Sequence, residues 1–201
     1  YSRGGQPAAS SDDYLKQTNL TLPSQEISET AASVASGKKT VLEKAVAISE
    51  WVHNRVSYDG FGFGATVESA QSTFEKKRGT CDEYSHLFAA MARSIGIPTK
   101  FIAGVVCSGN CSYAENWGPH AWNEILADGA WVPFDSTFNE GIVLDATHAK
   151  FAEGRDQYDI TEKLSTATSG YQLDGVAMAR EVRVTLVDWK EFDALETSVS
   201  V

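Results

Sequence analysis

The segment Arg-Gly-Thr-Cys-Asp-Glu-Tyr (residues 78–84), which runs on to Ile-Gly-Ile-Pro (residues 95–98), decides the fold class of this chain. Apolar residues recur between these ends at helical spacing. Thr80 can cap a helix, and Gly96 can end it. We therefore predict a helix over residues 79–96. Its core face would hold the following side chains: Cys81, Tyr84, Leu87, Phe88, Met91 and Ile95.

Strand signals follow this helix. Residues 99–106 are predicted to form one strand, and a Gly-, Asn- and Ser-rich loop comes after it. Residues 120–127 and 130–135 are predicted to form two more, joined by Asp-Gly, which is among the strongest short signals for a hairpin. The order predicts a Cys-bearing helix that precedes an antiparallel sheet.

Cys81 lies where a helix can activate a thiol. A cysteine taken alone is more often a small buried apolar residue than a nucleophile. In the first turn of a helix, however, unpaired N–H groups and the macrodipole stabilise a thiolate and can hold a developing oxyanion. Gly79 permits a tight entry into that turn. We predict that Cys81 is a nucleophile with a lowered pKa.

His120 is the predicted base, because an amine leaving group needs a proton from a group such as histidine. It opens a predicted strand directly after Gly-Pro, at an edge where functional residues are common. The other three histidines are expected to be structural. His53 and His86 fall within predicted helices, and His148 falls in an irregular segment.

The predicted hairpin indicates which carboxylate orients His120. With a two-residue turn, Trp122 faces Asp135, so His120 and Asp135 are diagonal neighbours about 7 Å apart on one face. Asp135 would accept a hydrogen bond from one imidazole nitrogen while the other faces the thiol. A turn longer or shorter by one residue would separate the two. Asp145, in Asp-Ala-Thr-His, is the competing carboxylate.

Together these motifs resemble the transglutaminase-like superfamily, in its prokaryotic type. Residues 78–98 look like the Cys-helix motif of that family, and His-Ala-Trp-Asn-Glu (residues 120–124) is similar to its histidine strand. Trp-Val-Pro-Phe-Asp-Ser-Thr (residues 131–137) resembles its Trp-x-x-x-Asp-Pro-Thr strand, with Ser136 where the family usually has Pro. The upstream Val-Ser-Tyr-Asp (residues 56–59) fits the family's lead-in, and the resemblance covers about half of the chain.

Two further features of the family are matched less fully. The Asp-Ala-Thr-His segment (residues 145–148) resembles a downstream feature of prokaryotic members and is expected to be structural. In some relatives an upstream aromatic side chain stabilises the oxyanion. The sequence does not decide between Trp51 and Tyr58 for that role.

The resemblance implies a papain-like α+β fold, with the Cys helix packed on an antiparallel sheet that carries His and Asp. It implies a catalytic triad of Cys81, His120 and Asp135, with no cofactor and no metal. The expected chemistry is cleavage or transfer at an amide carbonyl through a thioester, most simply by a hydrolase. A protein-glutamine transamidase is the second candidate. A noncatalytic peptide-binding module of a larger surface protein represents a different class.

The expected organisation has three parts. Residues 1–37 are Ser-, Thr- and Ala-rich and are expected to be an extended or partly disordered lead-in. Residues 38–164 would form the transglutaminase-like core, beginning with an amphipathic helix from Thr40 to about Ser57. Residues 165–201 would form an extension with a late strand at residues 181–187, which closes the sheet or opens a following domain.

Composition excludes some partners. The 201 residues carry a net charge of −10, and phosphate binding needs clustered Lys and Arg that this chain lacks, so we expect no nucleic-acid partner. No apolar run approaches the length of a membrane helix, so we expect no membrane insertion by this segment. The expected partner is a peptide or protein substrate. The oligomeric state stays open.

The cysteines divide into one thiol and one close pair. Cys107 and Cys111 flank a short turn and are candidates for a disulfide, with two free thiols as the alternative. A disulfide and the acidic composition favour an extracellular or cell-surface location. Because the chain begins with Tyr1 rather than Met, it is expected to be a fragment of a longer one.

Overall fold

The computed structural model describes residues 10–59 and 67–167, which form an α+β domain. The helices are η1 (Ser11–Leu15), α1 (Gln25–Ala35), α2 (Val41–Arg55), α3 (Ala70–Lys76), α4 (Cys81–Ser94), η3 (Ala114–Asn116) and α5 (Gln157–Ala167). The strands are β1 (Ser57–Tyr58), β2 (Arg78–Gly79), β3 (Thr99–Cys107), β4 (Trp117–Ala127), β5 (Ala130–Asp135), β6 (Glu140–Gly141) and β7 (His148–Gly154).

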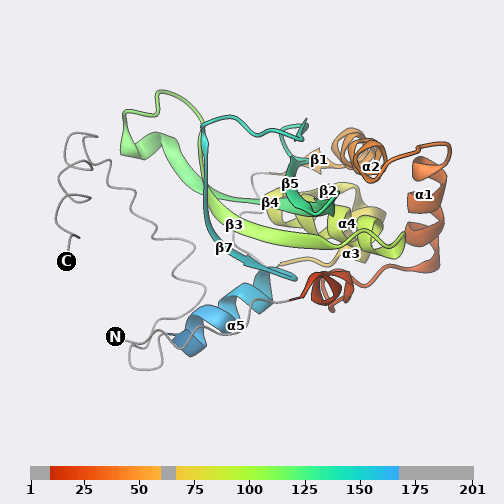
Figure 1. The fold of residues 1–201 in the computed structure, drawn as a ribbon. Coiled ribbons are helices and arrows are strands. Elements are labelled where there is room, and N and C mark those ends of the chain that lie inside the picture. Colours follow the sequence, from red (N-terminus) through yellow and green to blue (C-terminus); the bar gives the residue numbers. More distant parts are fainter. Residues whose placement is uncertain (1–9, 60–66, 168–201) are drawn as a thin grey trace.

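A five-stranded antiparallel sheet forms the centre of the domain, with the order β6-β5-β4-β3-β7. Helices α1, α2 and α4 gather along one side of it, and α5 lies beside β7 (Figure 1). A separate parallel pair, β1 with β2, leads into α4. The Cys-bearing helix thus packs on an antiparallel sheet that carries His120 and Asp135, which is the predicted papain-like arrangement.

The main core lies between α4 and the sheet. Leu87, Phe88 and Met91 of α4 are completely buried there, and each such side chain stabilises the fold by roughly 1.5–3 kcal/mol. Helices α1 and α2 add Ile27 and Ile48 to the same cluster. Because α4 is buried on nearly every side, the first turn that carries Cys81 has a fixed position against β4.

The local signals for the central elements are confirmed. Thr40 caps α2, with its hydroxyl accepting from the N–H of Glu43 at 3.1 Å. The chain leaves α4 through Gly96 at a positive φ of 82°. Strand β5 has the predicted bounds, and the β4–β5 turn pairs Ala127 with Ala130. Local periodicity and turn chemistry therefore sufficed for these elements.

The expectation for the lead-in was wrong over residues 25–35, which form α1. Ser24 caps this helix by accepting from the N–H of Ile27 at 3.2 Å. Ile27, Ala31 and Ala35 are spaced by four residues and are buried. Small alanine side chains weakened the apolar signal in the sequence, whereas in the fold they allow α1 to pack closely on α2 and α4.

Other boundaries also differ from the predictions. Strand β4 begins at Trp117, so His120 lies within the strand instead of opening it. His148, expected to fall in an irregular segment, begins β7, and β6 and α5 also lie in the stretch after Asp135. The late strand predicted at residues 181–187 lies outside the described residues. Within the described ranges, every helix is too short or too polar to cross a membrane.

Candidate active site

Cys81 is the first residue of α4 and is almost fully buried. Its side chain packs in a small cluster with Phe101, Ala121 and Ile160. The N–H of Ala121 hydrogen-bonds the sulfur, and the thiol lies 3.7 Å from Oδ1 of Asp82. Because Ala121 directly follows His120 in β4, the thiol lies at the part of the sheet that carries the predicted base.

A buried carboxylate holds the first turn of α4 in place. Oε2 of Glu83 accepts from the N–H of Thr80 at 2.8 Å and from its hydroxyl at 2.7 Å. Oε1 of Glu83 accepts from the N–H of Glu68 at 3.0 Å. A Cβ at Gly79 would lie only 2.4 Å from Cβ of Glu83. The glycine that precedes the thiol is therefore required by the packing of Glu83.

The expected lowered pKa of Cys81 is not what this environment produces. Burial raises the pKa of the thiol well above its usual value, and the charge on Asp82 acts in the same direction. The hydrogen bond from the N–H of Ala121 opposes them but does not outweigh them. The sequence showed the helix N-terminus but not the depth of burial. In the free protein, Cys81 is therefore a thiol at neutral pH.

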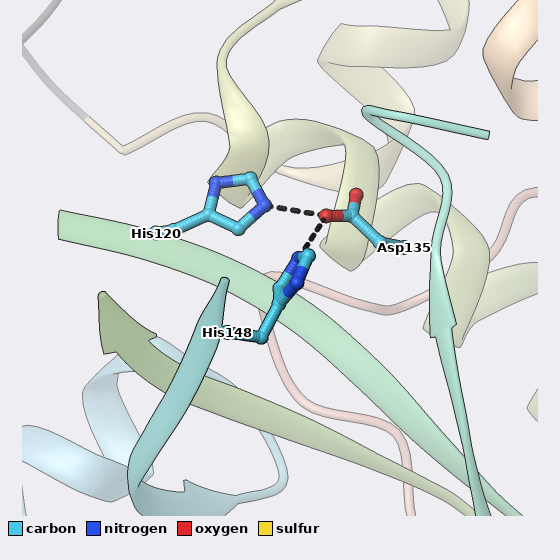
Figure 2. Close-up of side chains that lie close together, drawn as sticks. All are labelled: His120, Asp135 and His148. Carbon is cyan, nitrogen blue, oxygen red and sulfur yellow. Dashed lines mark hydrogen bonds and ion pairs between the residues drawn. The ribbon is translucent and has the colours of Figure 1, made fainter. Parts of the chain in front are cut away.

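His120 and Asp135 are joined by a short hydrogen bond, with 2.6 Å between Nε2 and Oδ2 (Figure 2). The β4–β5 ladder runs from Ala127–Ala130 to Asn123–Phe134 and, continued by one pair, sets Trp122 opposite Asp135. This is the register that the two-residue turn predicted. Since the buried carboxylate accepts from Nε2–H, Nδ1 is the nitrogen of His120 left free to take a proton.

Asp135 is completely buried and accepts four hydrogen bonds. Its Oδ1 accepts from the N–H groups of Thr137 at 2.8 Å and Phe138 at 3.2 Å. Its Oδ2 accepts from His120 and from Nε2 of His148, the latter at 3.1 Å. Burial alone would raise the pKa of Asp135, but the hydrogen bonds from the two histidines hold it well below its usual value. The carboxylate of Asp135 is thus ionised where it contacts Nε2 of His120.

Asp145, the competing carboxylate, has a different partner. Its Oδ1 lies 3.3 Å from Nδ1 of His148 and accepts from the N–H of Thr147 at 2.9 Å. Its side chain is exposed, in contrast to that of Asp135. The structure thus brings Asp135, and not Asp145, into contact with His120.

His148 is the residue of this site that sequence reasoning missed. It begins β7, whose Cα register sets it opposite Val106 of β3, and β3 separates it from β4. No spacing in the sequence predicts a contact between β7 and the end of β5. The resemblance of the Asp-Ala-Thr-His segment to a family feature was the one available signal, and it was interpreted as structural.

Aromatic side chains hold the ring of His120. Phe138 stacks on it at 4.8 Å between ring centroids, and Trp122 lies on it at 6.1 Å. Phe138 is 46% exposed, so it covers the imidazole from the solvent side. Trp122 fits because position 104 is Gly: a Cβ there would lie 2.6 Å from Cη2 of Trp122. The packing fixes the ring plane of the predicted base.

The remaining histidines lie outside this cluster, as expected for structural residues. His86 is fully buried and stacks on Phe101 at 4.9 Å. Burial lowers the pKa of His86 to about 4, so it is neutral at physiological pH. Nδ1 of His53 lies 3.1 Å from the backbone oxygen of Ser136.

The two upstream aromatic residues, Trp51 and Tyr58, have different surroundings in the structure. Trp51 stacks on Phe74 at 5.7 Å, where it packs against the main core. Tyr58 is half-exposed, and burial together with the charges on Cys81 and Asp82 raises the pKa of Tyr58 to about 12. Its hydroxyl group is therefore protonated, and a hydrogen-bond donor, at neutral pH.

Among the residues that the structure describes, two groups of side chains bring potential metal-ligand atoms within 4.8 Å of one another: His120, Asp135 and His148, and Glu140, Asp145 and His148. In the first group, contacts of 2.6 and 3.1 Å join each histidine to the aspartate. These are hydrogen-bond distances. We therefore treat the first group as a hydrogen-bonded network and assign no metal ligands in either group.

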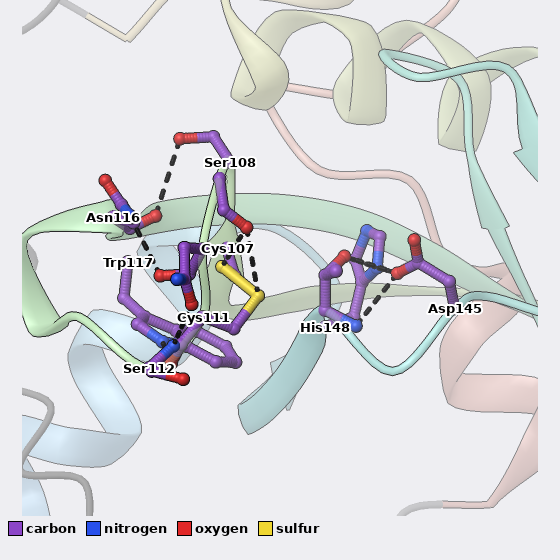
Figure 3. The surroundings of a disulfide bond; sticks show 11 residues. Cys107, Ser108, Cys111, Ser112, Asn116, Trp117, Asp145 and His148 are labelled. Atoms are coloured by element: carbon purple, nitrogen blue, oxygen red, sulfur yellow. Dashed lines mark hydrogen bonds and ion pairs between the residues drawn. A yellow bond between two sulfur atoms is a disulfide. The ribbon is translucent and has the colours of Figure 1, made fainter.

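Cys107 and Cys111 form a disulfide at the end of β3 (Figure 3). The N–H of Cys107 donates to the backbone oxygen of Thr147 at 3.0 Å. Nε1 of Trp117 donates to the backbone oxygen of Cys111 at 3.1 Å. The bridged loop therefore joins the start of β4 to the start of β7, which places His148.

Asp82 provides a prediction about the thiol. Burial, assisted by the charge on Glu83, raises the pKa of Asp82 to about 6, so above this pH its charge opposes thiolate formation at Cys81. We expect Asp82→Asn to speed alkylation of Cys81 by iodoacetamide about three- to tenfold at pH 8. The ratio to wild type should approach one below pH 6. Peptide mapping locates the label.

Asp128→Asn is the matched control, because Asp128 occupies the β4–β5 turn at a positive φ of 49° that Asn tolerates. Its alkylation rate should equal that of wild type. An unchanged or slower rate in Asp82→Asn would show that Asp82 does not oppose ionisation of the thiol.

Comparison with known proteins gives a family for this arrangement. The model of the transglutaminase-like superfamily matches residues 28–136, more than half of the chain. Kyphoscoliosis peptidase from Mus musculus is 30% identical over 127 residues, which are 55% of this chain and 17% of that protein. The Homo sapiens protein of the same name is 28% identical over 142 residues, 62% of this chain and 20% of that protein.

A solved structure agrees with the fold. The crystal structure of a provisionally assigned cysteine protease from Cytophaga hutchinsonii superposes with a TM-score of 0.62 and 27% identity. The match covers 76% of this chain and 50% of that one. The chain thus spans half or less of each of these relatives, which together support a thiol enzyme in general. From its matched region and its fold, the chain belongs to the transglutaminase-like superfamily.

Proposed function

We propose that this protein is a cysteine-dependent hydrolase that cleaves an amide or peptide bond through a thioester on Cys81. One observation carries the proposal: His120 of β4 lies 2.6 Å from the buried carboxylate of Asp135 in β5, and Ala121, the residue after His120, hydrogen-bonds the thiol of Cys81. A nucleophile, a base and a group that orients the base are the three parts that acyl transfer requires.

The first half of the reaction follows from the protonation states. Nδ1 of His120 takes the proton from the Cys81 thiol as the sulfur attacks the carbonyl carbon. Removal of this proton during attack suits a thiol whose pKa is raised by burial. The imidazolium, stabilised by Asp135, then gives the proton to the departing amine, and the C–N bond breaks. A thioester on Cys81 remains.

Water completes the cycle. It attacks the thioester carbon while Nδ1 of His120 accepts its proton. The C–S bond then breaks, the proton returns to the sulfur, and a carboxylic acid leaves. The sum is one amide and one water converted to one acid and one amine.

The developing oxyanion has two sources of donors. The first N–H groups of α4 have no partner within the helix and point at its N-terminal end. The Tyr58 hydroxyl, protonated because its pKa is about 12, is the proposed side-chain donor. Trp51 packs away from the thiol and is not proposed for this role.

A peptide or protein is the proposed substrate. The names of the similar mouse and human proteins include the word peptidase, which supports hydrolysis ahead of transamidation. The acyl-enzyme is the same in both reactions, and only the acceptor differs. The Cys107–Cys111 disulfide supports the further proposal of an extracellular or cell-surface location.

The test is to trap the acyl-enzyme. We would mix the protein with acyl p-nitrophenyl esters and a peptide library, quench in acid and measure intact mass. Wild type should gain one acyl group on Cys81, and Cys81→Ala should gain none. Adding methylamine as a competing acceptor separates the activities: a hydrolase yields mainly acid, and a transamidase mainly the N-methylamide.

The binding-module alternative has its own signature in the same experiment. It predicts no acyl group on Cys81 with any ester, together with equal peptide binding by wild type and Cys81→Ala. That pair of results would overturn the proposed function.

A further inference from the structure

One carboxylate oxygen of Asp135 contacts the rings of two histidines. Nε2 of His120 lies 2.6 Å and Nε2 of His148 lies 3.1 Å from Oδ2 of Asp135. Figure 2 shows the two rings reaching the carboxylate from different strands. The ring centroids are 5.7 Å apart, so a proton on one ring strongly affects the other. A Cys-His-Asp site needs only one of these histidines.

Burial strengthens the electrostatic interaction of the two histidine rings with Asp135 and with each other. The side chains of His148 and His120 are each 4% exposed, and that of Asp135 is 0% exposed. Charges in such a place are screened much less than at the surface. Oδ1 of Asp135 is already occupied by the N–H groups of Thr137 and Phe138. The carboxylate therefore cannot turn to give each histidine its own oxygen.

Acidic groups surround His148 more fully than His120. Nδ1 of His148 faces Asp145 at 3.3 Å, Nε2 faces Asp135, and the charge on Glu140 of β6 also acts on the ring. His120, on β4, is a basic group that faces the ring of His148. Trp122 and Phe138 supply its aromatic neighbours. His148 is thus the better proton acceptor of the pair.

The direction of the pKa agrees with this placement. Burial would lower the pKa of His148, but the hydrogen bond and charge of Asp135, with contributions from Asp145 and Glu140, raise it above the usual value. A raised pKa means that protonated His148 stabilises the fold below about pH 6.5, and that this contribution disappears as the pH rises through the folded value.

We propose that His148 is a positioning residue that holds the shared oxygen of Asp135 from β7 and, when protonated, shares the charge of Asp135 and so opposes protonation of His120. The inference rests on the proposed function of the site. It assigns His148 no contact with the substrate and no step of bond making.

Both forms of His148 can hold Asp135. When protonated, it donates from Nε2 to Asp135 and from Nδ1 to Asp145. When neutral, Nε2–H still donates to Asp135. Positioning is therefore independent of pH, whereas sharing of charge occurs only in the protonated form. A substitution that keeps the donor and removes the charge separates the two effects.

His148→Gln is that substitution, because its amide N–H can reach Asp135 without carrying a charge. We would label the histidines of Cys81→Ala with 13C and 15N and follow the rings by NMR as the pH falls. This titration requires no substrate and no activity. In Cys81→Ala, the His148 ring should bind a proton above the usual histidine range as the pH falls.

In Cys81→Ala/His148→Gln, the titration midpoint of His120 should move up by about one to two pH units, because a neighbouring positive charge is lost. Cys81→Ala/His53→Gln removes a histidine outside the cluster and should leave the His120 midpoint in place. If His120 titrates at the same pH with and without His148, the inference is overturned even when the enzyme is active.

Activity provides the second readout. In the otherwise wild-type protein, His148→Gln should raise the apparent pKa of the acid limb of kcat/KM and leave the rate at pH 8.5 within about threefold. His148→Leu, which lacks the donor, should also lose about tenfold at pH 8.5. A purely structural role would lower the plateau in both variants and leave the acid limb unmoved.

Discussion

Asp135→Asn is expected to lower kcat/KM by about 10⁴-fold, the loss that the corresponding change causes in Ser-His-Asp enzymes. The hydrogen bonds explain why. Oδ1 of Asp135 accepts from two backbone N–H groups, so the amide oxygen of Asn must take that place. The NH2 group then replaces Oδ2 and donates to Nε2 of His120. This forces the proton of His120 onto Nδ1, where the nitrogen can no longer accept one from Cys81.

Asp145→Asn is the matched control, since Asp145 contacts His148 and not His120. Its kcat/KM at pH 8.5 should stay within about threefold of wild type. If Asp145→Asn loses as much activity as Asp135→Asn, the prediction that Asp135 is the carboxylate that orients His120 is contradicted. Circular dichroism establishes that both variants fold before rates are compared.

Stability should also depend on Asp135, with a defined pH window. The folded-state pKa lies well below its usual value, so the charged form stabilises the protein above about pH 4. That contribution disappears as the pH falls through the folded value. Asp135→Asn lacks it at every pH, so its stability should differ most from wild type at neutral pH.

The elements that the sequence predicted are those with local causes. Helix α4 has its cap, its apolar face and its glycine end within eighteen residues, and the β4–β5 hairpin has an Asp-Gly turn that sets its register. Because register determines which side chains share a face, the contact of His120 with Asp135 followed from it. The most informative feature of the site was therefore encoded locally.

The features that were missed depend on tertiary structure. Helix α1 is stable because Ile27 and Ala31 pack on α2 and α4, which no window of sequence displays. The pKa of Cys81 rises because Phe101 and Ile160, from distant elements, enclose the thiol. His148 reaches Asp135 from β7, the strand on the far side of β3. Each of these depends on contacts between segments that are distant in the sequence, which the sequence did not reveal.

Arg93→Met is expected to lower the free energy of unfolding by about 3–5 kcal/mol, because it leaves several buried acceptors unpaired. Arg93 lies in the last turn of α4 and is 4% exposed. Its guanidinium donates to the backbone oxygen of Thr99 at 2.6 and 3.1 Å and to that of Arg155 at 2.6 Å. It also donates to the Thr21 hydroxyl at 3.0 Å.

One side chain thus joins the end of α4 to three other parts of the fold. They are the segment before α1, the start of β3 and the residue after β7. Burial lowers the pKa of Arg93 to about 10, so the group is still charged at neutral pH and donates through all its contacts. Met has a similar length and no donor, so the loss measures the hydrogen bonds rather than the volume.

Urea unfolding followed by tryptophan fluorescence checks the prediction, with Arg93→Lys as the graded variant. Lysine keeps the charge but has a single ammonium group in place of the planar fork, so it should satisfy fewer acceptors and lose about 1–3 kcal/mol. The order wild type, Arg93→Lys, Arg93→Met is the expected ranking of midpoints. If both variants unfold within 0.5 kcal/mol of wild type, on the order of a surface change, then Arg93 does not hold these segments together.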